Sequence, residues 1–210
     1  MGSGLAKASS LVVHKQSSQV QWIAQQVEKA QTTFTTVQMN LNEHVLDLIN
    51  KTSELVRGIV IMKNPNLLYV HYQAPINQFF YMTRRYTQLY QPDQNMDFKQ
   101  KIGSSVSMGY FRVGQRLDEY FKDSYVSLWK ETASTAILLL KAKTNKYHFQ
   151  SMKIFISKKN WWPYRVDVRT NSVLIRIVFN QFKFNIPVRN GFFHFVPPRG
   201  VSVVKEGIDF

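Results

Sequence analysis

The side chains with which this chain could do chemistry are five histidines and 13 acidic residues, and it has no cysteine. Clustered histidines and carboxylates bind metals or transfer protons, and thiolates act as nucleophiles. The histidines lie far apart, at positions 14, 44, 71, 148 and 194, and none has the spacing of a metal site. The sequence also lacks a GxSxG elbow and a GxxxxGK phosphate loop. We therefore expect no catalytic residue, no bound metal and no cofactor.

One short motif has to be weighed against this conclusion. Ser127 and Lys130 form an SxxK pair. That motif needs a helix to align its hydroxyl and its amine. The surrounding residues have the pattern of a strand, so we interpret the pair as coincidental and predict that the protein is not an enzyme.

The charge of the chain leaves several kinds of partner open. The formal net charge is +14. It fits a generally basic surface, attraction to anionic lipid head groups or an acidic partner, or nucleic-acid binding. Because no run of basic residues exceeds two, a dedicated nucleic-acid arm is disfavoured. No apolar run approaches the roughly 20 residues of a membrane-spanning helix, so we expect a soluble protein.

The N-terminal region is expected to lie outside the folded domain. Residues 1–4, Met-Gly-Ser-Gly, resemble an added leader, so a signal peptide is expected to have been removed. Residues 1–16 are predicted to be flexible, and residues 17–210 to form a single domain without an internal repeat or linker. Ser17 or Ser18 is expected to cap a helix that runs to about Ala30.

The rest of the chain has the period-two pattern of strands. Residues 36–42 alternate cleanly between apolar and polar side chains. Residues 93–108 are expected to form a loop, and residues 108–122 a weak helix with an apolar face. Further strands are predicted at residues 53–62, 67–73, 78–82, 86–91, 125–132, 135–143, 147–156, 164–169, 173–179, 192–195 and 201–203. Such short, regularly spaced strands indicate one large antiparallel sheet or barrel.

Residues 58–72, GIVIMKNPNLLYVHY, are two apolar runs joined by a polar corner. Both faces of these two strands are unusually apolar for an antiparallel sheet with a solvated face. A second layer must therefore cover them. A wide, incomplete barrel with helices on its open side would leave an apolar hollow suited to a lipid or an acyl chain.

Two motifs in the expected order resemble the LolA family of periplasmic lipoprotein carriers. The first is the corner just described, Lys63-Asn64-Pro65-Asn66-Leu67, followed by an aromatic strand. The second is residues 193–203, FHFVPPRGVSV, which is similar to the family ending F-x-F-x-P-P-x-G-V-x-V. The predicted first helix, followed by Thr33-Phe34-Thr35-Thr36, also resembles the start of the family fold. The order of elements matches over roughly residues 17–204.

The resemblance implies a mainly β (α+β) fold, an incomplete and strongly curved antiparallel barrel of about 10–11 strands whose open concave side is lidded by helices. It implies a monomeric periplasmic chaperone that carries acylated lipoproteins from the inner to the outer membrane. Its implied partners are an inner-membrane LolCDE-type ABC transporter and an outer-membrane LolB-type receptor, with no nucleic acid. Two alternatives remain: a LolB-like or RseB-like receptor or sensor of the same fold, and a basic module that binds membranes or nucleic acid.

The sequence departs from the family at two turns. The family often has an arginine that is proposed to hold the lid where this chain has Asn64. Asparagine lacks the reach and the fork of a guanidinium, so the resemblance leaves open how the lid-closure corner, Lys63, Asn64 and Pro65, works here. The family's Asp-Gly hairpin turn is replaced by Thr83-Arg84, and we expect another loop geometry because arginine resists positive φ.

The parity of the strands predicts which side chains line the cavity. Residues two apart on a strand share a face. The predicted lid helix adds two further residues. The predicted lipid-binding residues are Val37, Met39, Leu41, Leu68, Val70, Tyr72, Phe80, Met82, Phe111, Leu117, Leu138 and Leu140; the alternative for each is an ordinary core position between sheet and helix.

Overall fold

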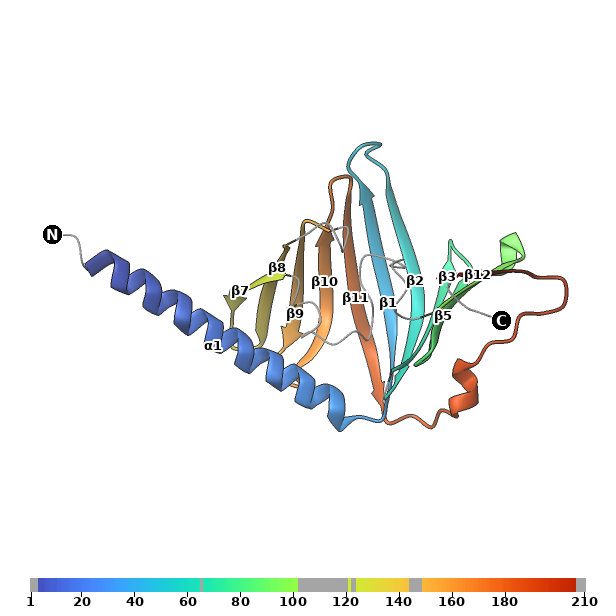
Figure 1. Cartoon of the computed structure of the whole chain (residues 1–210), viewed down its shortest axis with the longest axis horizontal. Helices are drawn as coiled ribbons and strands as arrows, with labels where there is room; N and C mark the ends of the chain where they lie inside the picture. Colours follow the sequence, from blue (N-terminus) through green and yellow to red (C-terminus); the bar gives the residue numbers. More distant parts are fainter. Residues whose placement is uncertain (1–3, 65, 102–120, 122–123, 144–148, 207–210) are drawn as a thin grey trace.

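The computed structural model describes residues 4–64, 66–101, 121, 124–143 and 149–206. In this part of the chain, twelve strands form one sheet and a single α-helix, α1 (Gly4–Thr33), lies across it (Figure 1). The described residues also form two short 3-10 helices, η1 (Pro92–Gln94) and η3 (Asn190–Phe193). The strands are β1 (Thr36–Asp47), β2 (Ser53–Lys63), β3 (Leu67–Ala74), β4 (Gln78–Met82), β5 (Tyr86–Gln91), β6 (Met96–Lys101), β7 (Ser124–Glu131), β8 (Thr135–Ala142), β9 (Ser151–Ser157), β10 (Trp162–Arg169), β11 (Val173–Phe184) and β12 (Ser202–Glu206).

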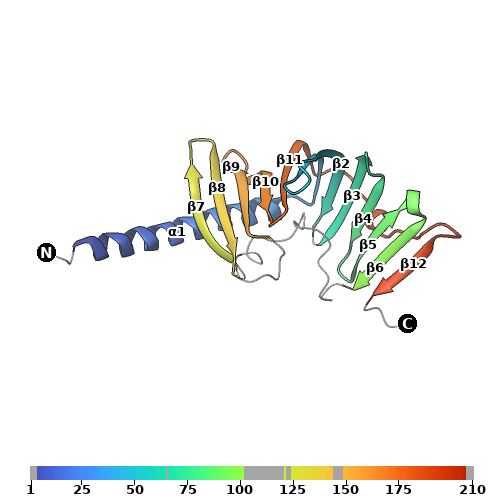
Figure 2. The same cartoon turned by 90° about the horizontal axis from the view of Figure 1, so that it is seen from above.

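The sheet is curved and open. Its strand order is β12-β6-β5-β4-β3-β2-β1-β11-β10-β9-β8-β7, so β1 lies near the centre and pairs with β2 and β11. Neighbouring strands are antiparallel, except that β12 pairs in parallel with β6. Seen from above, the strands follow an arc whose two ends, β7 and β12, do not meet (Figure 2). The predicted incomplete, strongly curved antiparallel barrel is therefore confirmed.

The alternating pattern of the sequence explains which face of the sheet is buried. On β1, Val37, Met39 and Leu41 are buried while the intervening residues are half-exposed. On β8, Ala136, Leu138 and Leu140 are completely buried in the same alternating manner. Cross-strand partners share a face, so these side chains define one side of the sheet, which we call the inner face. The opposite side is the outer face.

Gly58 on β2 is required by the close approach of β3. A Cβ atom at this position would lie 2.5 Å from the backbone oxygen of His71. The register between the two strands also shifts at Arg57 and Gly58. The glycine of the sequence motif therefore permits the tight β2–β3 contact at the end of the strand pair away from the polar corner, where Gly58 lies opposite Tyr72. At that corner Asn66 has a φ of 65°, a conformation that asparagine tolerates better than most residues.

Three elements differ from the sequence predictions. The helix begins at Gly4 rather than at Ser17 or Ser18, and no proline interrupts its first turns. Residues 96–101, expected in a loop, form β6, because Met96 and Phe98 alternate with Asp97 and Lys99. The strand predicted at residues 192–195 is instead η3 and the chain that leaves it.

The predicted second helix, at residues 108–122, lies outside the described residues except for residue 121. The cover of the inner face by helix is therefore established for α1. The helix crosses the sheet near one end of β7–β10, and its N-terminal part extends beyond the edge strand β7 (Figure 1).

Candidate functional site

The structure brings the described members of the predicted cavity set to one place. All of them belong to the cluster of buried and half-buried apolar residues on the inner face. They come from β1, β3, β4 and β8, and the strand register aligns them across the sheet. They are Val37, Met39, Leu41, Leu68, Val70, Tyr72, Phe80, Met82, Leu138 and Leu140. Phe111 and Leu117 lie outside the described residues. That these side chains bind lipid stays a prediction.

One half of the inner face, formed by β7–β11, is sealed from solvent, and α1 packs against part of it. Val20, Ile23 and Val27 on the helix are at most 5% exposed. They join the same cluster as Leu138 and Leu140. These two leucines are completely buried, so they behave as ordinary core residues.

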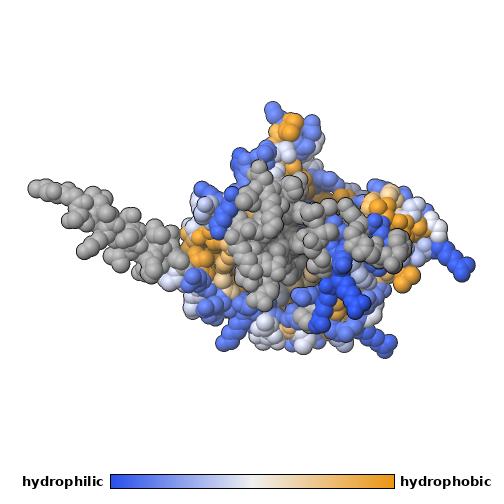
Figure 3. All heavy atoms as spheres, in the orientation of Figure 1, coloured by the Kyte–Doolittle hydropathy of each residue, from blue (hydrophilic) through white to orange (hydrophobic). Residues whose placement is uncertain are grey.

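The other half of the inner face, formed by β2–β5, is less completely covered. Tyr72, Phe80 and Met82 are half-buried, as is Met62 on β2. They surround fully buried residues such as Val60, so the apolar surface continues from the sealed half. Figure 3 views this side of the molecule, where apolar residues are visible beside α1 and at the β1–β2 turn. At this turn Ile49 is 73% exposed.

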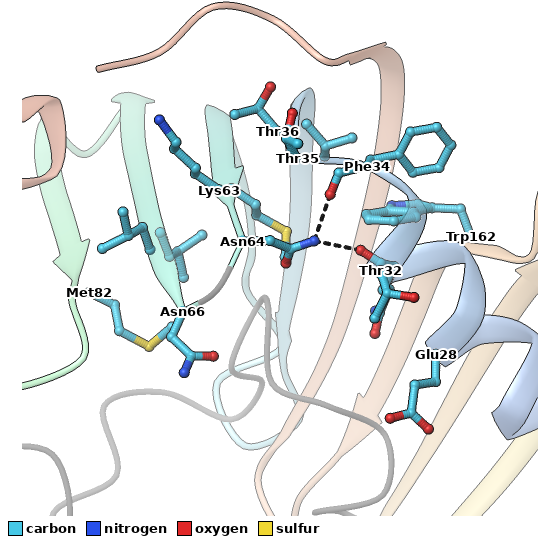
Figure 4. A pocket seen from close by; sticks show the side chains of 15 residues that line it. Glu28, Thr32, Phe34, Thr35, Thr36, Lys63, Asn64, Asn66, Met82 and Trp162 are labelled. Carbon is cyan, nitrogen blue, oxygen red and sulfur yellow. Dashed lines mark hydrogen bonds between the residues drawn. The ribbon is translucent and has the colours of Figure 1, made fainter. Parts of the chain in front are cut away.

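A cavity of about 530 Å³ opens where the two halves meet, beside the end of α1. Its walls combine apolar side chains with a polar rim (Figure 4). The apolar wall includes Phe34, Val37, Met62, Leu68, Met82 and Trp162, and the rim includes Glu28, Thr32, Lys63 and Asn64. The corner that the sequence predicted to control closure therefore lies at a cavity that three of the predicted lining residues also reach.

Asn64 ties this corner to the end of α1. Its side-chain amide donates hydrogen bonds to the backbone oxygens of Gln31 and Phe34, both at 2.6 Å (Figure 4). Its backbone N–H donates to the oxygen of Thr35 at 2.9 Å. The last carbonyls of a helix have no partner within the helix, so Asn64 satisfies an acceptor that water would otherwise occupy. Asparagine at this position thus holds the helix end by contact with the backbone, without a guanidinium.

The neighbouring residues of the corner are held differently. The ammonium of Lys63 donates to the backbone oxygen of Val188. Lys63 therefore connects the corner to the segment after β11 rather than to the helix. Pro65 lies outside the described residues.

Carboxylates mark one end of the open half of the inner face. Burial raises the pKa of Glu43, and the nearby carboxylate of Glu54 raises it further. Burial also raises the pKa of Tyr72, with a smaller contribution from Glu43. Desolvation disfavours the charged form of a carboxylate. Ionisation of Glu43 at this end of the face therefore costs free energy.

The outer face of β3–β5 has a cover that the sequence reasoning missed. Residues 185–201, between β11 and β12, run back over this face as a segment that we call the C-terminal strap. The ring of Phe192 lies 4.8 Å from that of Tyr69, and Phe195 stacks on Tyr81 at 5.0 Å. Phe193 in η3 is completely buried. A helical lid or lipid was expected to cover the second apolar face of β2 and β3. On β3 that cover is the strap.

The aromatic residues of the outer face were the available signal for this cover. Tyr69, Tyr81 and Tyr90 have the opposite parity to the inner-face set. Tyr90 also contacts Phe195, with ring centroids 4.8 Å apart. Three aromatic rings on the outward positions of adjacent strands predict a partner layer, and the phenylalanines of residues 192–195 were the aromatic run left to supply it.

The turn after β4 agrees with the expected departure from an Asp-Gly hairpin. The N–H of Thr83 donates to the oxygen of Tyr86 at 2.9 Å. The Thr83 hydroxyl in turn accepts from the N–H groups of Arg85 and Tyr86. A threonine side chain thus closes the loop, and another loop geometry is confirmed.

The groups considered first for chemistry are dispersed in the fold. Ser127 and Lys130 lie on strand β7, as predicted. His71 stacks on Phe79 at 4.1 Å, and His194 meets the hydroxyl of Tyr86 at 3.3 Å. Within the described ranges, no three histidine, aspartate or glutamate side chains are placed to hold a metal ion. The helix that the structure describes is not apolar enough along its length to cross a membrane.

Comparison with known proteins supports the resemblance read from the two motifs. An outer-membrane lipoprotein carrier protein of Pseudomonas putida strain W619 is 25% identical over 203 residues, covering 95% of this chain and 92% of the relative. The carrier protein of Pseudomonas entomophila strain L48 is 24% identical over 197 residues, covering 92% and 91%. No protein-family model matches the chain.

Solved structures give the same result for the fold. A LolA superfamily protein from Nitrosomonas europaea aligns with a TM-score of 0.50 at 11% identity, covering 83% of this chain and 97% of that one. The chain is a homologue of the lipoprotein carrier proteins and has the LolA fold. An uncharacterized conserved protein from Thermus thermophilus aligns with a TM-score of 0.61 at 16% identity. The alignment covers 90% of this chain and 99% of the Thermus protein.

Proposed function

We propose that this LolA-fold protein is a periplasmic carrier that shelters the acyl chains of lipoproteins on its inner face. The observation that carries the proposal is the continuity of that face. It runs from the sealed core on β7–β11 to half-buried apolar residues on β2–β5, next to a cavity with a polar rim. The names of the homologous carrier proteins point to the same cargo.

The free energy of the cargo explains why such a face would be needed. Each buried CH₂ contributes about 0.8 kcal/mol, so an acyl chain of about 16 carbons is held in a bilayer by roughly 12 kcal/mol. A carrier has to replace that environment with apolar surface and still release the chain. The flexible thioethers of Met62 and Met82 suit this task, because methionine adapts to ligands of changing shape.

The end of α1 is the proposed moving part. Two side-chain hydrogen bonds from Asn64 hold it, and each net hydrogen bond contributes about 1 kcal/mol. Displacing this end would widen the cavity between Phe34 and Met82 at a moderate cost. The proposed function includes no covalent step, so it requires neither enzymatic activity nor a cofactor.

The proposed partners follow from the route of the cargo. An inner-membrane LolCDE-type transporter would load the carrier, and an outer-membrane LolB-type receptor would unload it. The same fold could instead retain lipoprotein as a receptor or sensor. A transfer assay separates these functions, because a carrier passes its cargo to acceptor membranes that bear the receptor and a sensor keeps it.

The test is co-purification with an acylated lipoprotein, followed by mass spectrometry of the bound species. We expect bound lipoprotein with its acyl chains, and no binding of the same lipoprotein when its acylated cysteine is replaced. Met82→Glu places a charge on the open half and should abolish binding. Val196→Glu is the matched control, because Val196 is 81% exposed on the C-terminal strap. Absence of acylated cargo under every loading condition would refute the proposal.

A further inference from the structure

The outer face carries a second concave region, on the side of the sheet opposite α1. A hollow of about 830 Å³ extends over β8, β9, β10, β11 and β1. None of its lining residues belongs to the C-terminal strap. The strand register places Leu139 opposite Lys153, Lys153 opposite Asp167, and Asp167 opposite Arg176. These side chains therefore form one continuous row across four strands.

The floor of the hollow is partly apolar. Leu139, Leu174 and Val178 are half-buried within it, and Leu46 lies at its edge. A second row, parallel to the first, joins Lys141 through Ser151 to Arg169 and on to Leu174. Apolar and cationic side chains thus alternate over the same surface.

The charges in the hollow are strongly unbalanced. Four cationic side chains, Lys141, Lys153, Arg169 and Arg176, line it together with one carboxylate, that of Asp167. That carboxylate is already engaged, because Arg165 donates to it at 2.8 Å and Arg176 at 3.2 Å. Among the described residues, no carboxylate forms an ion pair with Lys141, Lys153 or Arg169. The hollow therefore presents uncompensated positive charge to solvent.

An exposed tryptophan borders the same hollow on the edge strand β7. Trp129 is 56% exposed, and the ammonium of Lys153 lies 4.1 Å from the centre of its ring. Tryptophan and arginine are the residue types that most often dominate protein–protein binding energy. Their combination with apolar floor residues is typical of an interface centre and its rim.

We propose that this hollow is a docking site for an acidic segment of a partner protein, one in which leucine-like side chains alternate with aspartate or glutamate. The carboxylates of the segment would pair with Lys141, Arg169 and Lys153, and its apolar side chains would rest on Leu139 and Val178. A concave surface is complementary to a protruding segment, whereas a lipid bilayer is flat on this scale. The proposal rests on the outer face alone and does not depend on the carrier function.

The dimensions set the length of the probe. Five strands at about 4.8 Å per step span roughly 19 Å, which an extended peptide of about six residues covers. The probes are therefore peptides of that length that alternate leucine with glutamate or aspartate. A peptide with lysine at every acidic position is the matched control. Binding is followed by NMR of the full isotope-labelled chain, which shows where each peptide binds.

The expected result is that acidic peptides shift the resonances of Trp129 and of the hollow, and that lysine peptides do not. Lys141→Glu combined with Arg169→Glu should weaken binding at least tenfold, and affinity should fall as salt rises. Arg84→Glu removes a cation from the exposed β4–β5 turn, away from the hollow, and should leave peptide affinity unchanged.

Three outcomes would overturn the proposal. The first is that no acidic peptide binds, and the second is that peptides shift inner-face resonances instead. The third is that phosphatidylglycerol vesicles bind through Lys141 and Arg169 while the peptides do not, which would assign the surface to a membrane. Lipoprotein binding measured on the Lys141→Glu, Arg169→Glu variant is expected to be normal, so failure of this site is distinguishable from failure of the carrier function.

Discussion

The two halves of the inner face are both apolar but are buried to different degrees. On β8 and β9, Leu138, Leu140 and Ile154 are completely inaccessible to solvent. On β3 and β4, Tyr72 and Phe80 remain partly exposed although they belong to the same continuous cluster. Apolar side chains at corresponding positions therefore serve as core in one half and remain available in the other. The difference shows that an inward-facing position on the sheet does not by itself decide whether an apolar side chain stays accessible to a ligand.

The largest effect is expected from a truncation in the sealed half. Leu138→Ala should lower the free energy of unfolding by about 2–5 kcal/mol, because it leaves a cavity among residues that cannot collapse into it. Denaturant unfolding measures this value. Phe80→Ala in the open half should cost clearly less, although it removes more atoms. Equal losses at the two positions would remove the distinction between the halves.

Cargo binding should respond in the opposite order. Phe80→Ala is expected to weaken the binding of a fluorescent fatty acid by about tenfold, equivalent to about 1.4 kcal/mol, because its ring belongs to the accessible apolar surface. Leu140→Ala, compared under conditions in which both variants are folded, should bind the probe nearly as well as the original chain. A stronger binding defect in Leu140→Ala would place the ligand in the sealed half instead.

The boundary between the halves can be loosened at Asn64. Asn64→Asp keeps the shape of the side chain but removes both donated hydrogen bonds, so the last turn of α1 should lose about 1–3 kcal/mol of local stability. Hydrogen exchange of the amides near Gln31 measures this opening, and release of bound fatty acid should become faster. Asn64→Arg restores donors with a longer reach and should retain protection. Unchanged exchange in Asn64→Asp would show that the helix end is held by its packing alone.

The smallest effect concerns the charged end of the open half. Burial raises the pKa of Glu43, so the folded state binds a proton more readily than the unfolded chain. Its ionisation therefore lowers stability as pH rises above the ordinary glutamate range, and this loss is absent at lower pH. Glu43→Gln should be more stable than the original chain at neutral pH, and the difference should vanish below about pH 4. Thermal unfolding across this range measures the effect, and a pH-independent difference would contradict it.

The sequence predicted the sheet well where side chains alternate strictly. Residues 36–41 and 136–140 have one buried partner layer, so period two determines both the strand and its inward face. Strand β6 was missed because the polar character of residues 93–108 outweighed the short alternation from Met96 to Lys99. The strand predicted at residues 192–195 failed because its aromatic side chains serve as a cover, a role that local propensity does not distinguish from pairing.

The sequence predicted where the candidate site lies, but not which of its residues are sealed and which are accessible. Parity placed Leu68, Val70 and Leu138 on one face correctly. It gave no means of separating sealed from accessible positions, because that depends on which segments distant in the sequence pack over each strand. Likewise, Asn64 was recognised as a departure, but its hold on backbone oxygens depends on distances that no spacing of residues specifies.

The pairing of β1 with β11 has a consequence for how the chain assembles. Strands β2–β6 and β7–β11 are each connected in simple succession, so most of their contacts join residues close in sequence. The β1–β11 pair instead joins residues such as Val37 and Phe184, and β12 must find β6 across a similar separation. Local hairpins form faster than pairs that close long loops. The two halves of the sheet are thus positioned to fold as separate meanders during synthesis, and the chain becomes a single curved sheet when its last strands are available.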